Sequence, residues 1–191
     1  MPEIEQHILD DITPVVLVGG HSQRFGRNKL LEPVRGRMLV SIPVDALRRV
    51  FGPRVAAVGA CDPGVAAMAD AVLEDPYPGL GPVGGICAAL EGARGDVFVC
   101  AGDLVAIDAR AIRTVLASAA ANPDALACLA HDGRLHPTIG MYRGGCLPYF
   151  EQAIRESALR LRSILPEGSV VHAAVASSAT RNINRPEDLS D

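Results

Sequence analysis

The residues best suited to chemistry in this sequence lie between Gly19 and Lys29, where two glycines are followed by three cations. The pair Gly19-Gly20 lets the backbone turn sharply and lets a ligand approach it closely. Arg24, Arg27 and Lys29 follow within one short segment. Backbone N–H groups can face phosphate oxygens, and cations can neutralise the charge that shifts during phosphoryl transfer. The segment therefore predicts a site that holds a polyphosphate.

The spacing of these residues separates the segment from two common phosphate loops. The pattern G-x-x-x-x-G-K-[ST] is absent because Lys29 follows Asn28 and precedes Leu30, and G-x-G-x-x-G is absent as well. The segment instead resembles the signature loop of nucleotidyltransferases, L-x-G-G-x-S-x-R-x-G-x-x-K. Every fixed position of that pattern is filled, by Leu17, Gly19, Gly20, Ser22, Arg24, Gly26 and Lys29. A glycine-rich surface turn with solvated cations is the alternative, and so many matches at fixed spacing argue against it.

Short apolar runs must position this segment, and they alternate with longer stretches of helical periodicity. Strands are predicted at 15–18, 54–59, 71–74, 96–101, 125–130, 138–142 and 170–175. Helices are predicted at 39–50, 62–70, 83–93 and 109–121, with two helical stretches between 144 and 165 that break near Ser157. Strands repeatedly followed by helices favour right-handed crossovers. The predicted fold is α/β, with a three-layer, mostly parallel Rossmann-like sheet of the nucleotidyltransferase type.

Composition limits the class of protein. The 191 residues suit a single domain over 1–191, in which 1–12 form a polar N-terminal extension. The resemblance of the loop implies that it is a nucleotidyltransferase domain. The net charge of −4 argues against nucleic-acid binding, although 19–37 carry five cations and one anion. The five cysteines include no C-x-x-C pair, so neither a zinc cluster nor a disulfide framework is indicated. Because no signal peptide opens the chain and no apolar run could span a bilayer, we expect a cytoplasmic protein without a membrane partner.

One carboxylate follows the predicted strand at 96–101. That run is apolar after its first residue, Asp96, which predicts a central strand with parallel neighbours. Ligands of such sheets bind beyond the carboxyl ends of the central strands, where Asp103 and the glycine segment would meet. Asp103 could hold Mg²⁺ there, because Mg²⁺ takes one or two carboxylates together with phosphate oxygens. The alternative is that Asp103 only stabilises the turn after the strand.

Further segments extend the resemblance over most of the chain. The sequence resembles the molybdenum cofactor guanylyltransferase family, nucleotidyltransferases that join GMP to molybdopterin. Besides the loop, the matching segments are Glu74-Asp75 with Pro78 to Ile86, His131 to Ile139, Arg160-Leu161-Arg162, and Asn182-Ile183-Asn184 with Pro186 to Leu189. The segments occur in the family's order and at sensible spacing, which makes the resemblance specific.

The resemblance implies Mg²⁺-dependent transfer of GMP from GTP to the terminal phosphate of molybdopterin, with pyrophosphate leaving. It implies nucleotide contacts from Leu17, Val18, Gly19, Gly20, Lys29, Asp75 and Asp103, of which Asp103 also holds the Mg²⁺. It implies acceptor contacts from His136, Asn182 and Asn184. We expect Arg24, Lys29 and Asp103 to be catalytic. Arg24 and Lys29 would offset charge on the α-phosphate and on pyrophosphate, and Asp103 would hold the Mg²⁺ that acts with them. The expected partners are GTP, molybdopterin, and proteins that deliver molybdopterin or receive the finished cofactor.

Two other functions stay open from the sequence. A cytidylyltransferase acting on molybdopterin or another phosphorylated acceptor would share most of these residues, but Gly19-Gly20 with Gly81 to Gly84 resembles the guanine-specific pattern. A catalytically retired nucleotide-binding regulator is suggested by Leu104-Val105, which replace the x-Pro that the family has after its Asp. His131 and His136 lie in a predicted polar loop without a third ligand nearby, so His136 is interpreted as a substrate contact rather than a metal ligand.

Overall fold

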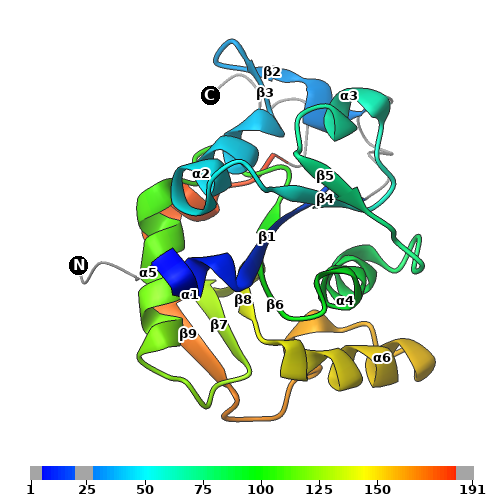
Figure 1. Cartoon of the computed structure of the whole chain (residues 1–191), viewed down its shortest axis with the longest axis vertical. Coiled ribbons are helices and arrows are strands. Elements are labelled where there is room, and N and C mark those ends of the chain that lie inside the picture. The colour runs from blue at the N-terminus through cyan, green and yellow to red at the C-terminus, as the bar shows by residue number, and fades with distance from the viewer. Residues whose placement is uncertain (1–5, 20–27, 184–191) are drawn as a thin grey trace.

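A seven-stranded sheet organises the part of the chain that the computed structural model describes, residues 6–19 and 28–183. The strands run in the order β5-β4-β1-β6-β8-β7-β9 (Figure 1). They are β1 (Ile12–Leu17), β4 (Ala56–Val58), β5 (Ala71–Leu73), β6 (Asp96–Ala101), β7 (Ala127–His131), β8 (Leu135–Tyr142) and β9 (Val170–Ala174). A separate hairpin pairs β2 (Pro33–Val34) with β3 (Arg37–Met38).

Helices cover both faces of the sheet, which confirms the predicted three-layer α/β fold (Figure 1). The α-helices are α1 (Gln6–Asp10), α2 (Ser41–Phe51), α3 (Pro63–Ala66), α4 (Gly81–Ala93), α5 (Ala109–Ala120) and α6 (Leu147–Arg155). The 3-10 helices are η1 (Lys29–Leu31), η2 (Gly144–Cys146), η3 (Leu161–Ser163) and η4 (Ser177–Thr180). None of the described helices is long and apolar enough to cross a membrane.

The two faces of the sheet have separate hydrophobic cores. Successive residues of a strand point to opposite faces. Val16 of β1 and Phe98 of β6 therefore pack with α2 and α5, whereas Val15 and Val99 pack with α4 and α6. Because both faces of the central strands are buried, these strands are nearly continuous apolar runs, and this property made them predictable.

The sheet is mostly parallel, but the prediction of parallel neighbours for β6 is wrong on one side. β1 pairs parallel with β4 and β6, and β7 pairs parallel with β9. β8 pairs antiparallel with both β6 and β7. The crossover through α5 places β7 one strand away from β6, and the tight β7–β8 turn, with Gly133 at φ 105°, folds β8 back into the space between them.

Other differences from the sequence prediction lie in short elements. The expected polar extension contains α1, whose Leu9 is 7% exposed, and β1 begins within it at Ile12. His131 and His136 were predicted in a loop but belong to β7 and β8. The break at Ser157 is confirmed by its φ of 56°, although only the 3-10 helix η3 follows it.

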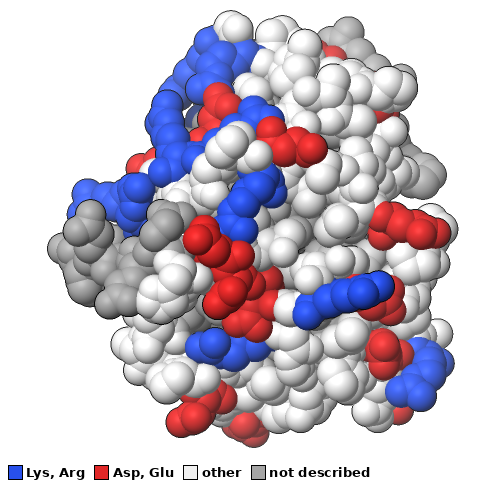
Figure 2. Space-filling model, in the orientation of Figure 1, with Lys and Arg blue, Asp and Glu red and all other residues white. Residues whose placement is uncertain are grey.

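The β2–β3 hairpin was not predicted either. Its turn residues Arg35 and Gly36 both have positive φ, 51° and 77°, as tight hairpin turns require. An arginine at the first of these positions does not resemble the usual Asn-Gly or Asp-Gly turn, which explains the omission. Figure 2 shows Lys and Arg side chains gathered over the hairpin, which carries Arg35 and Arg37.

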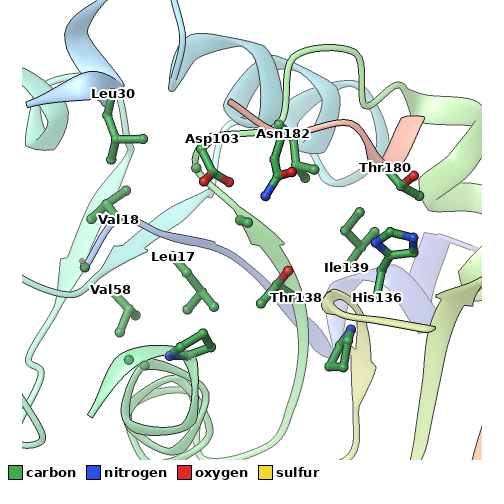
Figure 3. A pocket seen from close by; sticks show the side chains of 18 of the residues that line it. Leu17, Val18, Leu30, Val58, Asp103, His136, Thr138, Ile139, Thr180 and Asn182 are labelled. Atoms are coloured by element: carbon green, nitrogen blue, oxygen red, sulfur yellow. The ribbon is translucent and has the colours of Figure 1, made fainter. Parts of the chain in front are cut away.

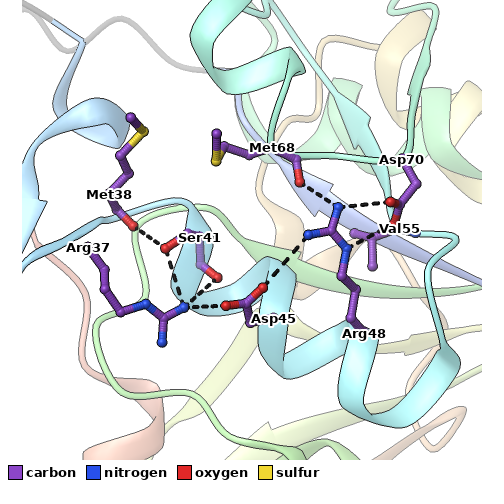
Figure 4. A network of polar contacts seen from close by, with 8 residues as sticks. All are labelled: Arg37, Met38, Ser41, Asp45, Arg48, Val55, Met68 and Asp70. Carbon is purple, nitrogen blue, oxygen red and sulfur yellow. Dashed lines mark hydrogen bonds and ion pairs between the residues drawn. The ribbon is translucent and has the colours of Figure 1, made fainter.

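A network of charged side chains fastens α2 to the strands at the edge of the sheet (Figure 4). The guanidinium of Arg48 donates to both carboxylate oxygens of Asp70, from Nε at 3.1 Å and from Nη2 at 2.8 Å. Arg48 also donates to the Met68 carbonyl oxygen, and the Val55 N–H donates to Asp70 at 2.9 Å. The hydrogen bond from Arg48 is the main cause that lowers the pKa of Asp70 below its usual value.

Asp70→Ala is expected to lower the free energy of unfolding by about 1–2 kcal/mol, because it removes charge-assisted hydrogen bonds to a side chain that is 24% exposed. Urea unfolding of the purified variant measures this loss. The control is Asp45→Ala, since Asp45 contacts Arg37 and Arg48 from a more exposed position. A larger loss for Asp45→Ala than for Asp70→Ala would contradict this account.

Candidate functional site

A pocket of about 740 Å³ opens beyond the carboxyl ends of β1 and β6, where the sheet topology predicts a ligand (Figure 3). Most residues named from the sequence line it: Leu17, Val18, Gly19, Lys29, Asp75, Asp103, His136 and Asn182. The remaining three, Gly20, Arg24 and Asn184, lie outside the described residues. The structure therefore brings together residues that are spread over most of the chain.

Lys29 and Asp103 form an ion pair in this pocket. Lys29 Nζ lies 2.6 Å from Asp103 Oδ2, and the two side chains are 20% and 17% exposed. Lys29 is the first residue of η1, which Asn28 caps by accepting a hydrogen bond from the Leu30 N–H. Nζ also donates to the Ile183 carbonyl oxygen at 2.9 Å. The pair places one cation and one carboxylate at the same point of the pocket.

The composition of the chain also distinguishes Lys29, independently of the loop motif. Lys29 is the only lysine among the 18 basic Lys and Arg residues. An ammonium group is a compact point charge, whereas a guanidinium is a wide planar fork. The compact group fits between the Asp103 carboxylate and the Ile183 carbonyl oxygen.

Glycines allow the strand ends to meet closely beneath the pocket. Gly59 follows β4 with φ 117°, and a Cβ there would lie 2.3 Å from the Gly19 nitrogen. Gly102 follows β6 and donates its N–H to the Leu17 carbonyl oxygen at 2.9 Å. A Cβ on Gly102 would lie 2.9 Å from that oxygen. Side chains at these positions would push the end of β1 away from its neighbours.

Leu104-Val105, which depart from the family pattern, connect Asp103 to the C-terminal segment. The Val105 N–H donates to the Arg181 carbonyl oxygen, and the Ile183 N–H donates to the Asp103 carbonyl oxygen, both at 3.0 Å. Leu104 forms an antiparallel bridge with Asn182. Proline has no N–H, so it could not make the bond that Val105 makes. The departure therefore has a structural role, which is to hold Asn182 beside Asp103.

The pocket has two ends, and Asp103 lies between them (Figure 3). Leu17, Val18 and Val58 line one end. Pro82 and Gly85 from the start of α4 also line the pocket, as does Asp75, whose carboxylate accepts a hydrogen bond from the Tyr77 N–H at 2.9 Å. His136, Thr138, Thr180 and Asn182 line the other end. We call the first end the β1 end and the second the β8 end.

His136 at the β8 end is held by a buried carboxylate. His136 Nε2 lies 2.7 Å from Asp132 Oδ1, and these side chains are 12% and 7% exposed. The Thr180 hydroxyl donates to Asp132 Oδ2, and the Arg134 N–H lies 3.3 Å from Oδ1. The hydrogen bond from Thr180, followed by that from His136, holds the pKa of Asp132 well below its usual value.

Protonation of Asp132 is expected to destabilise the protein in acid. Because the folded pKa is lowered, the carboxylate contributes stability that is fully present above about pH 4 and is lost as the pH falls further. Asp132→Asn should therefore show a shallower loss of unfolding free energy below about pH 4 than the wild type. Urea unfolding at stepped pH measures the slopes, with Asp62→Asn, at an exposed helix cap, as the control. Equal slopes for Asp132→Asn and the wild type would refute this prediction.

Some lining residues were not named one by one in the sequence prediction. Arg134 and Thr138 lie in the segment from His131 to Thr138, which the resemblance implies on the molybdopterin side. Arg162 lies in another segment that carries the resemblance, and it donates to the Leu135 carbonyl oxygen at 2.8 Å. Thr180 had no sequence signal. Its partner Asp132 is 48 residues away in the sequence, and only the fold brings the two side chains together. His131 does not line this pocket and instead stacks on His172, with ring centroids 5.4 Å apart.

The donor groups suit a metal that also binds phosphate oxygens. Among the described residues, no group of three or more His, Cys, Asp or Glu side chains could hold a metal by itself. Mg²⁺ does not need such a group, since it is commonly held by one or two carboxylates together with substrate phosphates and waters. Asp103, with its partly exposed carboxylate on the pocket wall, fits that requirement.

Comparison with known proteins gives a consistent result. A family described as "MobA-like NTP transferase domain" matches residues 14–173. A protein of Carboxydothermus hydrogenoformans named "Probable molybdenum cofactor guanylyltransferase" is 31% identical over 145 residues, which cover 75% of this chain and 72% of that protein.

Solved structures extend the comparison to the fold. "Molybdopterin-guanine dinucleotide biosynthesis protein A" from Archaeoglobus fulgidus has a TM-score of 0.77 at 20% identity, with 94% of this chain and 95% of that chain covered. A "4-diphosphocytidyl-2C-methyl-D-erythritolsynthase" from Anaerococcus prevotii has a TM-score of 0.70 at 11% identity, with 96% of each chain covered. At these identities the likeness establishes the fold alone.

Proposed function

The chain belongs to the family of MobA-like NTP transferase domains, and on this premise we propose that it transfers GMP from GTP to the terminal phosphate of molybdopterin. The products would be the guanine dinucleotide form of the cofactor and pyrophosphate. The Lys29–Asp103 pair is the observation that carries this proposal, because it lies between the two ends of one pocket. A nucleotide at the β1 end and an acceptor at the β8 end would meet at this pair.

The proposed reaction is a single in-line displacement. An oxygen of the acceptor's terminal phosphate forms a bond to the α-phosphorus of GTP, while the bond from that phosphorus to the β-phosphate oxygen breaks. Pyrophosphate leaves with the bonding electrons. Because the attacking phosphate is already an anion, the site needs no strong general base. It needs positioning and charge neutralisation, which fixed cations supply.

Named residues supply these two requirements. Lys29 would neutralise charge on the α-phosphate and on departing pyrophosphate, together with Arg24 from outside the described residues. Asp103 would hold Mg²⁺, which neutralises phosphate charge when it is bound. Leu17 to Gly19 and Asp75 would contact the nucleoside, and the side chains at the β8 end would contact the acceptor. The Asn182 amide can donate and accept, which suits the amide-like edge of a pterin.

A second candidate function is cytidylyl transfer, because the nucleotidyltransferase fold also occurs in the Anaerococcus prevotii synthase named for a cytidylyl product. GTP is expected to raise the melting temperature in Mg²⁺ more than CTP at equal concentration. A ligand at 100 times its Kd stabilises by about 2.7 kcal/mol, whereas one near its Kd adds little. Thermal shift over a concentration series of each nucleotide tests this prediction. A larger shift with CTP would favour cytidylyl transfer.

A further inference from the structure

We infer that Asp132 is a positioning residue that fixes His136 as the Nε2–H tautomer and thereby presents Nδ1 to the acceptor as a hydrogen-bond acceptor. The inference rests on the proposed function for the identity of the acceptor, but not for the state of the imidazole ring. The acceptor group that Nδ1 would contact is an N–H donor, a kind of group that a pterin carries.

The contacts of Asp132 determine the tautomer. A carboxylate accepts hydrogen bonds and cannot donate them. One of its oxygens lies 2.7 Å from His136 Nε2, so Nε2 must carry the proton. In a neutral ring Nδ1 then has the lone pair, since only one imidazole nitrogen carries hydrogen. Among the described residues, no partner for Nδ1 of His136 is found.

The carboxylate is held in place from two separate parts of the chain. The Arg134 N–H belongs to the β7–β8 turn, and the Thr180 hydroxyl belongs to η4. Thr180 is 3% exposed and lies two residues before Asn182, which Leu104 holds beside Asp103. Asp132 therefore joins the two segments that line the β8 end, and its contacts fix the His136 ring before any ligand binds. Such preorganisation reduces the conformational entropy lost on binding.

The ring of His136 can be observed directly by ¹⁵N NMR without nucleotide or acceptor. In protein labelled with [¹⁵N]histidine, His136→Gln identifies its signals among the five histidines. We expect the Nε2–H pattern for wild-type His136 and a mixture of tautomers in Asp132→Asn. If Asp132→Asn fails to fold, Thr180→Val serves as the second variant. Thr180→Val keeps the Asp132 carboxylate, so His136 should retain the Nε2–H pattern. An Nδ1–H pattern in the wild type, or an unchanged His136 spectrum in folded Asp132→Asn, would overturn the inference.

Steady-state kinetics tests the contact with the acceptor. Loss of one well-oriented hydrogen bond should raise KM for molybdopterin about 5- to 10-fold in His136→Gln. Asp132→Asn keeps the Nε2–H tautomer in part of the molecules, so its KM for molybdopterin should rise by a smaller factor, about twofold. KM for GTP should be unchanged in both variants. His136→Asn, whose amide can replace Nδ1, should retain a lower KM for molybdopterin than His136→Gln. His172→Gln, outside the pocket, is the control. An equal rise in both KM values, or no rise in either, would overturn the contact. If the wild type forms no product, both the proposed function and the contact between His136 and molybdopterin are wrong. The NMR result then decides whether Asp132 fixes the tautomer of His136.

Discussion

Replacing Lys29 by alanine is expected to lower Mg²⁺-dependent GTP turnover about a hundredfold or more, because it removes a fixed cation from the point where charge would move in the proposed reaction. The Lys29 ammonium lies 2.6 Å from Asp103 and 2.9 Å from the Ile183 carbonyl oxygen, so its position is set before a substrate binds. Release of pyrophosphate in the presence of molybdopterin measures the loss. The melting temperature of the variant separates lost chemistry from lost folding.

Lys29→Arg tests whether charge alone is sufficient. The guanidinium keeps the charge but does not match the compact ammonium that fits between two oxygens. We expect its turnover to lie between those of the wild type and Lys29→Ala. Because Lys29 is the only lysine, chemical acetylation of its side chain tests its role without a mutation. An acetylating reagent should lower the turnover of the wild type, and saturating GTP should protect the turnover from the reagent. Near-normal pyrophosphate release by Lys29→Ala would remove Lys29 from the mechanism.

Replacing Asp103 by asparagine is expected to have an effect of similar size through a different cause. The amide keeps the size of the side chain but loses the charge that would hold Mg²⁺. Turnover should fall about a hundredfold or more, and the response to Mg²⁺ concentration should flatten. Lys29 would also lose its ion-pair partner, so the melting temperature is measured alongside turnover.

A matched carboxylate controls for the Asp103 substitution. Asp108 caps α5 by accepting a hydrogen bond from the Ala111 N–H at 2.8 Å, and asparagine caps helices about as well as aspartate. Asp108→Asn should therefore keep both the stability and the Mg²⁺ response of the wild type. If Asp103→Asn behaved like this control, Asp103 would be a structural residue of the turn after β6, which was its alternative interpretation from the sequence.

The central part of the fold was predictable because its physical cause is local. Val15 and Val16 lie in an unbroken apolar run, as residues buried on both faces of a sheet must. Ligands bind beyond the carboxyl ends of the central strands, and this rule predicted that Lys29 and Asp103 lie close together although they are 74 residues apart. The structure confirms that both residues line one pocket.

The parts that were not predicted depend on contacts between distant residues. No local pattern shows that β8 inserts between β6 and β7, because an apolar strand is compatible with either direction of pairing. Asp132 and Thr180 are 48 residues apart, and Thr180 belongs to the C-terminal segment that pairs with Leu104 and Val105. The missing proline made Leu104-Val105 look like a loss from the sequence, whereas the Val105 N–H makes a bond that proline could not make.

The most direct test of the proposed function is the mass of the product formed by the purified protein with molybdopterin, Mg²⁺ and an equimolar mixture of GTP and CTP. The account predicts the guanine dinucleotide of molybdopterin, formed together with one pyrophosphate per product. A cytosine dinucleotide would contradict the choice of base. Nucleotide binding without any dinucleotide product would contradict the enzyme itself and favour a nucleotide-binding regulator.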